Sequence, residues 1–407
     1  MPEGTTKKKK RVNVRTPEVM ERVQAEVANH YQSSIVEKAR AEGGVLAIGN
    51  TTVRLAKQFG FCYGVERAID LAYASRRVFP DNRIFLIGEI IHNPEVNRQL
   101  EEMNIVSLPW RAMNEEYDDL SEDDVVIVPA FGAPTSFMDK VESQGCLTVD
   151  TTCGDVMKVW KRVRGFANDG VTSIIHGKAD HEETRATASR AVGKDGEGNY
   201  LIVLTLEDSD YICDYIENGG DRGEFLARFG DAVSEGFDPD VHLERVGVAN
   251  QTTMLKSETE EIQRRVKRAV EKRDGNTEKF FVFDTICGAT QERQDALFEL
   301  LKRKMDMLLV VGGYNSSNTT HLVEIGEQEL PTFFIRSAQC LVSLGEIVHF
   351  DLHKHEEISS YSKVFSSDQD VDIGITAGAS CPSNLIEDTI LKVFELRGVS
   401  EESVRSA

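Results

Sequence analysis

The chain has 407 residues, a length typical of two or three domains, and 40% of them are apolar, which is enough for several packed cores. Its 47 basic and 68 acidic residues give a formal net charge of −21, which argues against a nucleic-acid-binding protein because phosphate contacts require a basic surface. No apolar run approaches the roughly 18 residues that span a bilayer, and seven scattered cysteines do not indicate a disulfide scaffold.

The N-terminal region begins with a basic run, KKKKR at residues 7–11. No apolar run follows it, so we do not expect a secretory signal, and early acidic residues argue against a transit peptide. The run also resembles a nuclear-import signal, a pattern with many chance matches, and we interpret it as a solvated tail. Residues 17–43 are predicted to be helical because three valines and Tyr31 recur at four-residue spacing. We therefore expect a partly helical N-terminal extension over residues 1–50 on a cytoplasmic protein.

From about residue 45, short runs rich in Val, Ile, Leu and Phe alternate with amphipathic stretches. Buried parallel strands joined by helices have this pattern, which predicts an α/β protein. The clearest predicted strands lie at residues 84–93, 125–132, 146–153, 171–177, 200–205, 245–252, 279–287, 307–313, 332–337 and 371–380.

A weak internal repeat divides these elements into three modules. Each copy has a strand-like entry, then a cysteine, a nearby glycine and a helical run, and the cysteines are Cys62, Cys153 and Cys287. We expect a first α/β module at 51–152 and a second at 153–286, and the second contains an acidic, loop-like surface insertion near 193–243. The third module is expected at 287–395, with an insertion near 349–370. A polar tail follows at 396–407.

Polar residues follow many of the predicted strands, where open parallel sheets bind their ligands. These ends carry Ser, Thr, Asn, His and Glu but almost no Lys or Arg. NSSN at 315–318 and QTT at 251–253 supply neutral donors suited to diphosphate oxygens, and helix N-termini add unpaired N–H groups. The same residue types are ordinary helix N-caps, so an isolated motif of this kind is compatible with either role.

The cysteines fall into two groups. Four are expected to be small buried residues with a structural role: Cys146, Cys213, Cys340 and Cys381. The three repeated cysteines could bind an iron–sulfur cluster or zinc, but the closely spaced cysteine pairs of structural zinc sites are absent from the sequence. Three soft thiolates with one coordination position left open suit a [4Fe–4S] cluster.

Eight motifs follow one another in the order of a known family. They are GFCYGVERAI (60–69), GEIIHNPEVNRQL (88–100), VDTTCGDVMKVW (149–160), HGKADHEET (176–184), NQTT (250–253), DTICGATQERQ (284–294), GGYNSSNTTHL (312–322) and GITAGASCPSNLIE (374–387). With these motifs the chain resembles the 4-hydroxy-3-methylbut-2-enyl diphosphate reductases, the IspH/LytB family, from about residue 53 to 394.

The resemblance implies a fold and a set of site residues. Three α/β modules with small parallel sheets would lie in a pseudo-threefold arrangement around a central [4Fe–4S] cluster ligated by Cys62, Cys153 and Cys287. Glu183 would deliver protons, and Thr253 would lie near the substrate hydroxyl. The substrate-binding residues that the resemblance implies are His92, His181, Thr252, Ser316, Ser317, Asn318 and Ser380.

The implied reaction is the last step of the methylerythritol phosphate route to isoprenoids. It converts 4-hydroxy-3-methylbut-2-enyl diphosphate to isopentenyl and dimethylallyl diphosphates with two electrons, two protons and loss of water. The implied electron donor is a protein such as a ferredoxin or a flavodoxin, and neither a nucleic acid nor a membrane is expected as a partner. The basic helical run formed by Lys158, Lys161, Arg162 and Arg164 is either a docking surface for that donor or a solvated helix face.

One departure from the family pattern lies in VPAFGAP (128–134), where Phe131 stands at a position that many members fill with histidine. Phenylalanine cannot donate to phosphate, so the other groups must carry more of the diphosphate binding. We interpret this difference as the trait of a subgroup.

Two other classes of function are weighed against the reductase. A non-catalytic iron–sulfur sensor with the same fold is disfavoured because Glu183, His181 and the NSSN loop are all present. A zinc-dependent hydrolase is disfavoured because the sequence contains no H-E-x-x-H motif.

Overall fold

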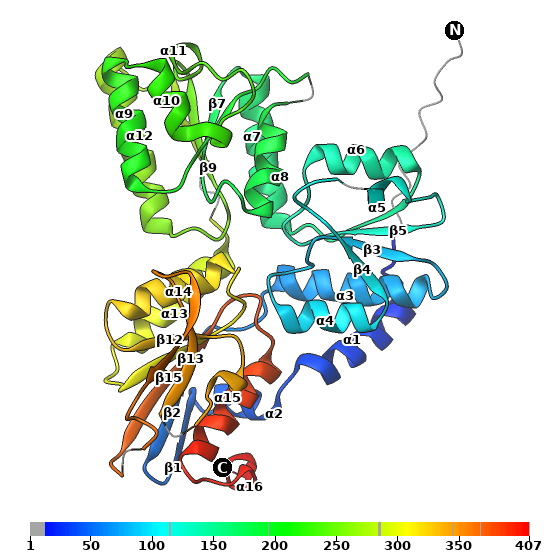
Figure 1. Ribbon diagram of the computed structural model, residues 1–407, viewed down its shortest axis with the longest axis vertical. Coiled ribbons are helices and arrows are strands. Elements are labelled where there is room, and N and C mark those ends of the chain that lie inside the picture. The colour runs from blue at the N-terminus through cyan, green and yellow to red at the C-terminus, as the bar shows by residue number, and fades with distance from the viewer. Residues whose placement is uncertain are drawn as a thin grey trace. The chain divides into compact units, whose positions relative to one another are not determined.

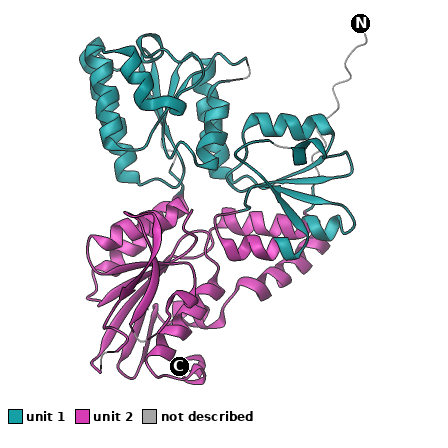
Figure 2. Ribbon diagram, in the orientation of Figure 1, with its two compact units in different colours: residues 1–14, 75–90, 101–287 teal, residues 15–74, 91–100, 288–407 magenta. Residues whose placement is uncertain are grey.

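The computed structural model describes residues 13–113, 115–193, 195–283, 286–343, 345–366 and 368–406 (Figure 1). The basic run predicted to be a solvated tail lies outside these residues. None of the helices in the described ranges is long and apolar enough to cross a membrane. The chain divides into two compact units (Figure 2): unit 1 contains residues 1–14, 75–90 and 101–287, and unit 2 contains residues 15–74, 91–100 and 288–407.

Unit 1 contains two four-stranded sheets in which all strand pairs are parallel. In spatial order, the first consists of β4 (Ile105–Leu108), β3 (Ile84–Ile87), β5 (Val125–Val128) and β6 (Leu147–Asp150). The second consists of β10 (Phe280–Val282), β9 (Val246–Asn250), β7 (Thr172–His176) and β8 (Tyr200–Val203). β7 and β9 are buried at every position, as expected of parallel strands covered on both faces.

The helices of unit 1 build its cores. They are α5 (Glu115–Asp118), α6 (Thr135–Gln144), α7 (Gly154–Asn168), α8 (Glu182–Ala191), α9 (Leu206–Asn218), α10 (Arg222–Phe229), the 3-10 turn η1 (Gly230–Ala232), α11 (Pro239–His242) and α12 (Lys256–Asp274). Besides the predicted strand at 200–205, the segment predicted as a loop-like surface insertion near 193–243 supplies α9 and α10, and its Ile212 and Phe225 are fully buried in the core beside β7 and β9. That prediction is wrong for most of the segment, because apolar side chains spaced along α9 and α10 pack inward.

Unit 2 contains a five-stranded sheet and a hairpin. In spatial order, the sheet consists of β1 (Val45–Ile48), β2 (Thr51–Leu55), β15 (Val371–Ala377), β11 (Met307–Val311) and β12 (Thr332–Ile335), and only the β1–β2 pair is antiparallel. The hairpin consists of β13 (Glu346–Asp351) and β14 (Glu356–Tyr361), within and beside the insertion predicted near 349–370. Its helices are α1 (Pro17–Tyr31), α2 (Ser34–Ala41), α13 (Gly288–Leu301), α14 (Ser317–Glu327), the 3-10 turn η2 (Ala338–Cys340), α15 (Ser383–Leu396) and α16 (Glu401–Ser406). Residues of α3 (Tyr63–Val78) and α4 (Pro94–Glu102) fall in both units.

Two features of unit 2 differ from the expected module boundaries. The predicted first module starts at residue 51, but β2 pairs in parallel with β15 and so belongs to the sheet of the C-terminal region. The predicted polar tail contains α16, whose Val404 is buried. The partner strand of β2 lies more than 300 residues further along the chain, and the burial of Val404 depends on packing. Neither can be read from the composition of the segment itself.

The predicted helical region 17–43 forms two helices with a break between them. Ser33 is extended, with φ −136°, and its hydroxyl accepts the N–H of Val36 at 3.0 Å, which caps α2.

Each of the ten predicted strand segments contains a strand, and the predicted fold class of α/β modules with small parallel sheets is confirmed. The pseudo-threefold arrangement of the modules stays a prediction.

Candidate active site

Two of the three predicted cluster ligands lie in unit 1. Cys153 follows β6 and is the N-cap residue of α7, and its N–H donates to the carbonyl of Ala130 at 2.8 Å. Cys287 directly precedes α13, and its N–H donates to the carbonyl of Thr252 at 3.3 Å. The Cys287 thiol donates to Asp155 Oδ2 at 3.3 Å. Both thiols are half-buried at helix N-termini, where the helix dipole favours a thiolate.

The third predicted ligand, Cys62, lies in unit 2 directly before α3 and is also half-buried. Two arginines hold the loop that leads to it. Arg40 of α2 donates to the carbonyl of Phe59 at 2.9 Å, and Arg293 of α13 donates to the carbonyl of Gly60 at 3.2 and 2.6 Å. The N-terminal extension therefore helps to position a predicted cluster ligand, a role that the sequence did not indicate.

The other four cysteines are buried, as predicted. Burial raises the pKa of Cys146 and of Cys213 to about 11, and burial also raises the pKa of Cys381. Because the thiolate is the form that binds metals, such thiols are poor ligands at neutral pH. Their surroundings therefore differ from those of the three half-buried cysteines.

The predicted proton donor, Glu183, is buried in the first turn of α8. Its Oε1 accepts the N–H of Thr252 at 2.6 Å, and its Oε2 accepts the Thr252 hydroxyl at 3.0 Å. These two bonds and the positive end of the helix dipole stabilise the carboxylate. His181 is the N-cap of the same helix, and its Nδ1 accepts the N–H of Glu183 at 3.1 Å, so the neutral ring carries its proton on Nε2.

Thr253 is partly exposed, and its hydroxyl accepts a hydrogen bond from Gln251 Nε2 at 2.8 Å. The buried Gln251 also accepts two bonds at its Oε1, from the N–H of Lys178 at 3.1 Å and from the hydroxyl of Thr184 at 3.0 Å. It therefore ties the end of β9 to the loop after β7 and to α8. The motif QTT predicts Gln251 as a neutral donor for diphosphate oxygens, whereas in the structure both atoms of its amide group make these internal hydrogen bonds.

Phe131 lies in the loop between β5 and α6, and its ring meets that of His181 edge-on, with centroids 6.2 Å apart. The loop is held by the neighbouring Gly132 and Ala133. Gly132 has φ +79°, and a Cβ at this residue would lie 2.2 Å from Trp160 Cζ2. The same Trp160 ring stacks on Arg190, whose guanidinium carbon lies 3.4 Å from the ring centroid.

Arg190 also donates to the carbonyl of Ala133 at 2.8 Å. Burial lowers the pKa of Arg190 to about 9, so the side chain is still a cation at neutral pH. Arg190 and Trp160 thus join the Phe131 loop to α7 and α8.

We expect Gly132→Ala to destabilise unit 1 by about 3 kcal/mol, because the left-handed backbone costs alanine about 1–2 kcal/mol and the collision with Trp160 adds about 1–3 kcal/mol. Thermal unfolding of the cluster-free full-length chain should show a transition lowered by about 5 °C or more. Gly165→Ala in α7 is the matched control, since a Cβ there meets nothing within 4 Å. An equal transition temperature for Gly132→Ala and the parent would contradict the packing described here.

Three serines and one asparagine are predicted to bind the diphosphate. They lie at the start of α14 and in the loop after β15: Ser316, Ser317, Asn318 and Ser380. All four are more than nine-tenths buried. Ser316 is the N-cap of α14, and its hydroxyl lies 3.4 Å from that of Ser380. The first turn of α14 directs its backbone N–H groups toward this end, which favours an anion without any lysine or arginine in the cluster.

Glycines allow the chain segments around these serines to approach closely. Ser380 Oγ donates to the carbonyl of His92 at 3.1 Å, and a Cβ on Gly313 would lie 2.4 Å from that same oxygen. A Cβ on Gly378 would lie 1.9 Å from Thr319 Oγ1. Unit 2 therefore brings His92 beside the predicted diphosphate-binding serines.

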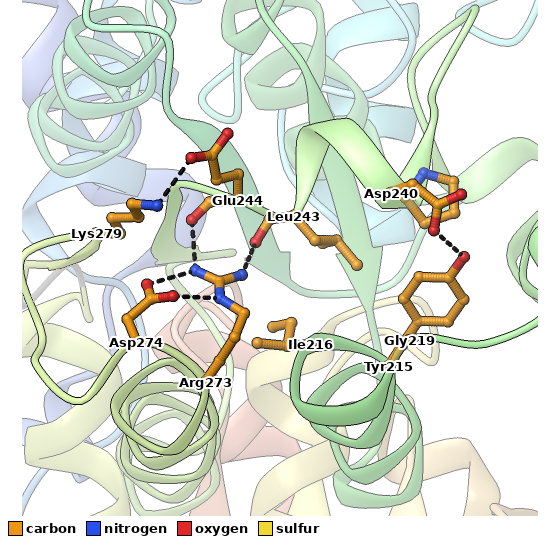
Figure 3. Close-up of a pocket in the computed structure, with 10 residues that line it drawn as sticks. Tyr215, Ile216, Gly219, Asp240, Leu243, Glu244, Arg273, Asp274 and Lys279 are labelled. Carbon is orange, nitrogen blue, oxygen red and sulfur yellow. Dashed lines mark hydrogen bonds and ion pairs between the residues drawn. The ribbon is translucent and has the colours of Figure 1, made fainter.

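A separate pocket of about 370 Å³ is lined by residues of α9, α11 and α12 in unit 1 (Figure 3). Its charged side chains pair with one another: Arg273 with Asp274 at 2.8 Å, and Lys279 with Glu244 at 2.8 Å. The residues that line it include none of the predicted site residues. This pocket is therefore distinct from the candidate active site.

Comparisons with known proteins agree with the motif pattern. The model of the LytB protein family matches residues 53–394. The 4-hydroxy-3-methylbut-2-enyl diphosphate reductase of Gloeobacter violaceus is 48% identical over 393 residues, which cover 95% of this chain and 92% of that protein. The proteins of the same name from Synechococcus sp. and Thermosynechococcus vestitus are 47% and 46% identical, over 90% and 94% of this chain and 91% and 94% of theirs.

Solved structures show the same fold. A structure of (E)-4-hydroxy-3-methyl-but-2-enyl diphosphate reductase, described as the terminal enzyme of the non-mevalonate pathway, is 26% identical with a TM-score of 0.51, over 84% of this chain and 99% of that one. The structure of the Plasmodium falciparum E-1-hydroxy-2-methyl-but-2-enyl-4-diphosphate reductase is 21% identical with a TM-score of 0.61, and the match covers 86% of this chain and 90% of that one. This likeness supports the fold alone. From its motifs, its α/β modules and these matches, the chain belongs to the LytB family.

Proposed function

We propose that the chain catalyses the reductive dehydroxylation of 4-hydroxy-3-methylbut-2-enyl diphosphate to isopentenyl and dimethylallyl diphosphates, the last step of the methylerythritol phosphate pathway. Relatives with this enzyme name match nearly the whole chain. The observation in the structure that carries the proposal is the position of Thr252. Its N–H and hydroxyl hold Glu183, while its carbonyl accepts the N–H of Cys287, so the predicted acid and a predicted cluster ligand share one residue.

We assign a [4Fe–4S] cluster to Cys62, Cys153 and Cys287. The donor set fits this group, because these three thiols are half-buried at helix N-termini while the other four are buried. When bound, such a cluster supplies electrons one at a time and a Lewis acid that assists the departure of oxygen. Three protein ligands leave one coordination position for the substrate.

Glu183 is assigned to proton delivery. The reaction consumes two protons and releases water, so the site needs a group that binds and releases a proton. In the carboxylate form Glu183 accepts hydrogen bonds at both oxygens from Thr252, which fixes the direction of the carboxylate. The same two bonds can form again each time Glu183 has given up a proton. Thr253 is assigned to the substrate hydroxyl, next to Thr252 in the chain.

The diphosphate is assigned to Ser316, Ser317, Asn318 and Ser380, with His92, His181 and Thr252 completing the substrate contacts. All of them are neutral hydrogen-bonding groups, and the N-terminus of α14 supplies the positive potential. His181 offers its Nε2–H as a donor because Nδ1 is occupied by the N–H of Glu183. Phe131, which cannot donate, is assigned to orienting the His181 ring through its edge contact.

The two electrons are assigned to an external protein donor such as a ferredoxin or a flavodoxin. Each of these carriers delivers one electron at a time at low potential. Two successive deliveries therefore match the two electrons that the reaction consumes.

The test is anaerobic purification of the full chain, followed by a visible spectrum, iron and sulfide analysis, and an assay with reduced methyl viologen as electron source. We expect a brown protein with about four irons and four sulfides that forms both isoprenoid diphosphates. A colourless protein that contains zinc would overturn the proposal. An iron–sulfur protein that is inert toward this substrate would favour the sensor.

A further inference from the structure

Helix α7 has one apolar face and one basic face. Its apolar face is buried and consists of Val156, Val159, Trp160, Val163 and Phe166. The opposite face is exposed and carries four cations, which we call the α7 basic face: Lys158, Lys161, Arg162 and Arg164. Four exposed cations within seven residues give this face a potential opposite in sign to the net charge of −21 of the chain as a whole.

The charges of this face are largely uncompensated. Lys158 forms an ion pair with Asp155 at 2.7 Å, and Arg162 stacks on the ring of Phe283, 4.0 Å from its centroid. In the ranges that the structure describes, no carboxylate forms an ion pair with Lys161, Arg162 or Arg164. Cations without an internal partner add positive potential at the surface instead of stability.

Helix α12 of the same unit shows the contrast. Its Arg264 is paired with Glu261 at 2.6 Å, and its Arg265 is paired with Asp210 at 2.6 Å. A surface of internally paired charges presents little net potential to a partner. However, Lys267 and Arg268 of α12 are exposed and, like the α7 cations, form no ion pair in the described ranges, so what distinguishes α7 is its position directly after Cys153.

The surface around these cations is open and partly apolar. A Cβ on Gly154 or on Gly165 would meet nothing within 4 Å, so there is open space beside the helix at both glycines. Met157 on this helix is 38% exposed, and Val282, beside the stacked Phe283, is 42% exposed. Exposed apolar side chains among charged ones are typical of transient protein interfaces.

We propose that the α7 basic face docks the acidic one-electron carrier protein that supplies the reaction, an inference that rests on the proposed function. α7 begins directly after Cys153, and Lys161 lies about 12 Å along the helix from that ligand, so a carrier docked here has a short path to it. At each encounter the carrier is oxidised by one electron, and two encounters supply the two electrons consumed. Attraction between opposite potentials speeds the encounter and weakens as salt increases.

The test uses Lys161→Glu/Arg164→Glu, which reverses two cations that no described carboxylate pairs with. Binding of an oxidised acidic [2Fe–2S] ferredoxin to the cluster-containing enzyme is measured by calorimetry at low salt and at about 0.3 M salt. Turnover is measured with reduced ferredoxin and with reduced methyl viologen, which needs no docking surface. We expect the affinity and the ferredoxin-supported kcat/KM to fall about tenfold or more, with viologen-supported turnover unchanged.

Lys267→Glu/Arg268→Glu on α12 is the matched control, since it makes the same charge change at exposed residues of the same unit. This control should keep both the affinity and the ferredoxin-supported rate near those of the parent. Unchanged ferredoxin binding and turnover in the α7 variant would overturn the docking proposal, as would an equal loss in the control or an equal loss with viologen. Absence of turnover with viologen in the parent enzyme would instead overturn the proposed function, and the binding measurement would still decide the docking surface.

Discussion

Glu183→Gln is expected to lower turnover by at least about 10²-fold while the iron and sulfide content stays at the level of the parent. Glutamine cannot bind and release a proton at this position. It also has only one oxygen to offer, whereas Glu183 accepts two hydrogen bonds from Thr252, so one donor of Thr252 would lose its partner. Turnover is measured with reduced methyl viologen, and the cluster is quantified by its visible spectrum and by iron analysis.

Glu207→Gln is the matched control for this experiment. Glu207 lies in the first turn of α9 as Glu183 does in α8, but it is exposed and pairs with Arg228 at 3.2 Å. Its replacement should leave turnover near that of the parent. Near-parental turnover of Glu183→Gln itself would show that Glu183 does not deliver protons. The protons would then have to come from other groups of the site.

Cys153→Ser is expected to abolish turnover and to leave the purified protein with little iron or sulfide. A serine hydroxyl is not ionised at neutral pH and is a hard ligand, so it does not replace a thiolate on iron. The fold should survive, because Cys153 is the N-cap of α7 and serine is among the preferred N-cap residues. Circular dichroism and the thermal transition of the cluster-free chain should therefore match those of the cluster-free parent.

Cys146→Ser provides the comparison within the same unit. Cys146 is buried in the core beside β5 and its pKa is raised to about 11, so it is not expected to bind the cluster. This variant should keep the iron and sulfide of the parent and lose about 1–3 kcal/mol of stability, because it buries a hydroxyl. A normal iron–sulfur content in Cys153→Ser would refute the ligand role of Cys153.

The strands that sequence reasoning recovered are those whose own composition marks them. β7, β9 and β11 are buried at every position; β11 is a continuous apolar run, and β7 and β9 each keep apolar residues at their centre. β4 was missed because it is short and exposes its two central residues at the edge of its sheet. β13 and β14 were missed because their pairing is with each other and most of their side chains are polar or only partly buried.

The roles of the predicted site residues stay predictions, but the local geometry around several of them follows from the sequence for a similar reason. Residues in helix-capping motifs, such as Cys153, His181 and Ser316, have a local geometry that the chain around them dictates. The role of Gln251 in tying chain segments together was not predicted, because its partners, Lys178 and Thr184, lie on another segment. Sequence spacing gives no information on such contacts between distant segments.

The sequence by itself determined the family and the α/β class and predicted the residues proposed to carry the chemistry, because apolar periodicity, helix caps and motif order are local properties of the chain. Only the tertiary structure decided that Thr252 joins Glu183 to Cys287, and that β2 pairs with β15. These are contacts between segments far apart in the chain, and they form only when each segment buries its apolar face against the others. The basic face of α7 follows from both levels. The sequence places four cations on one side of the helix, and the packing of the opposite, apolar side against the core leaves these cations exposed to solvent.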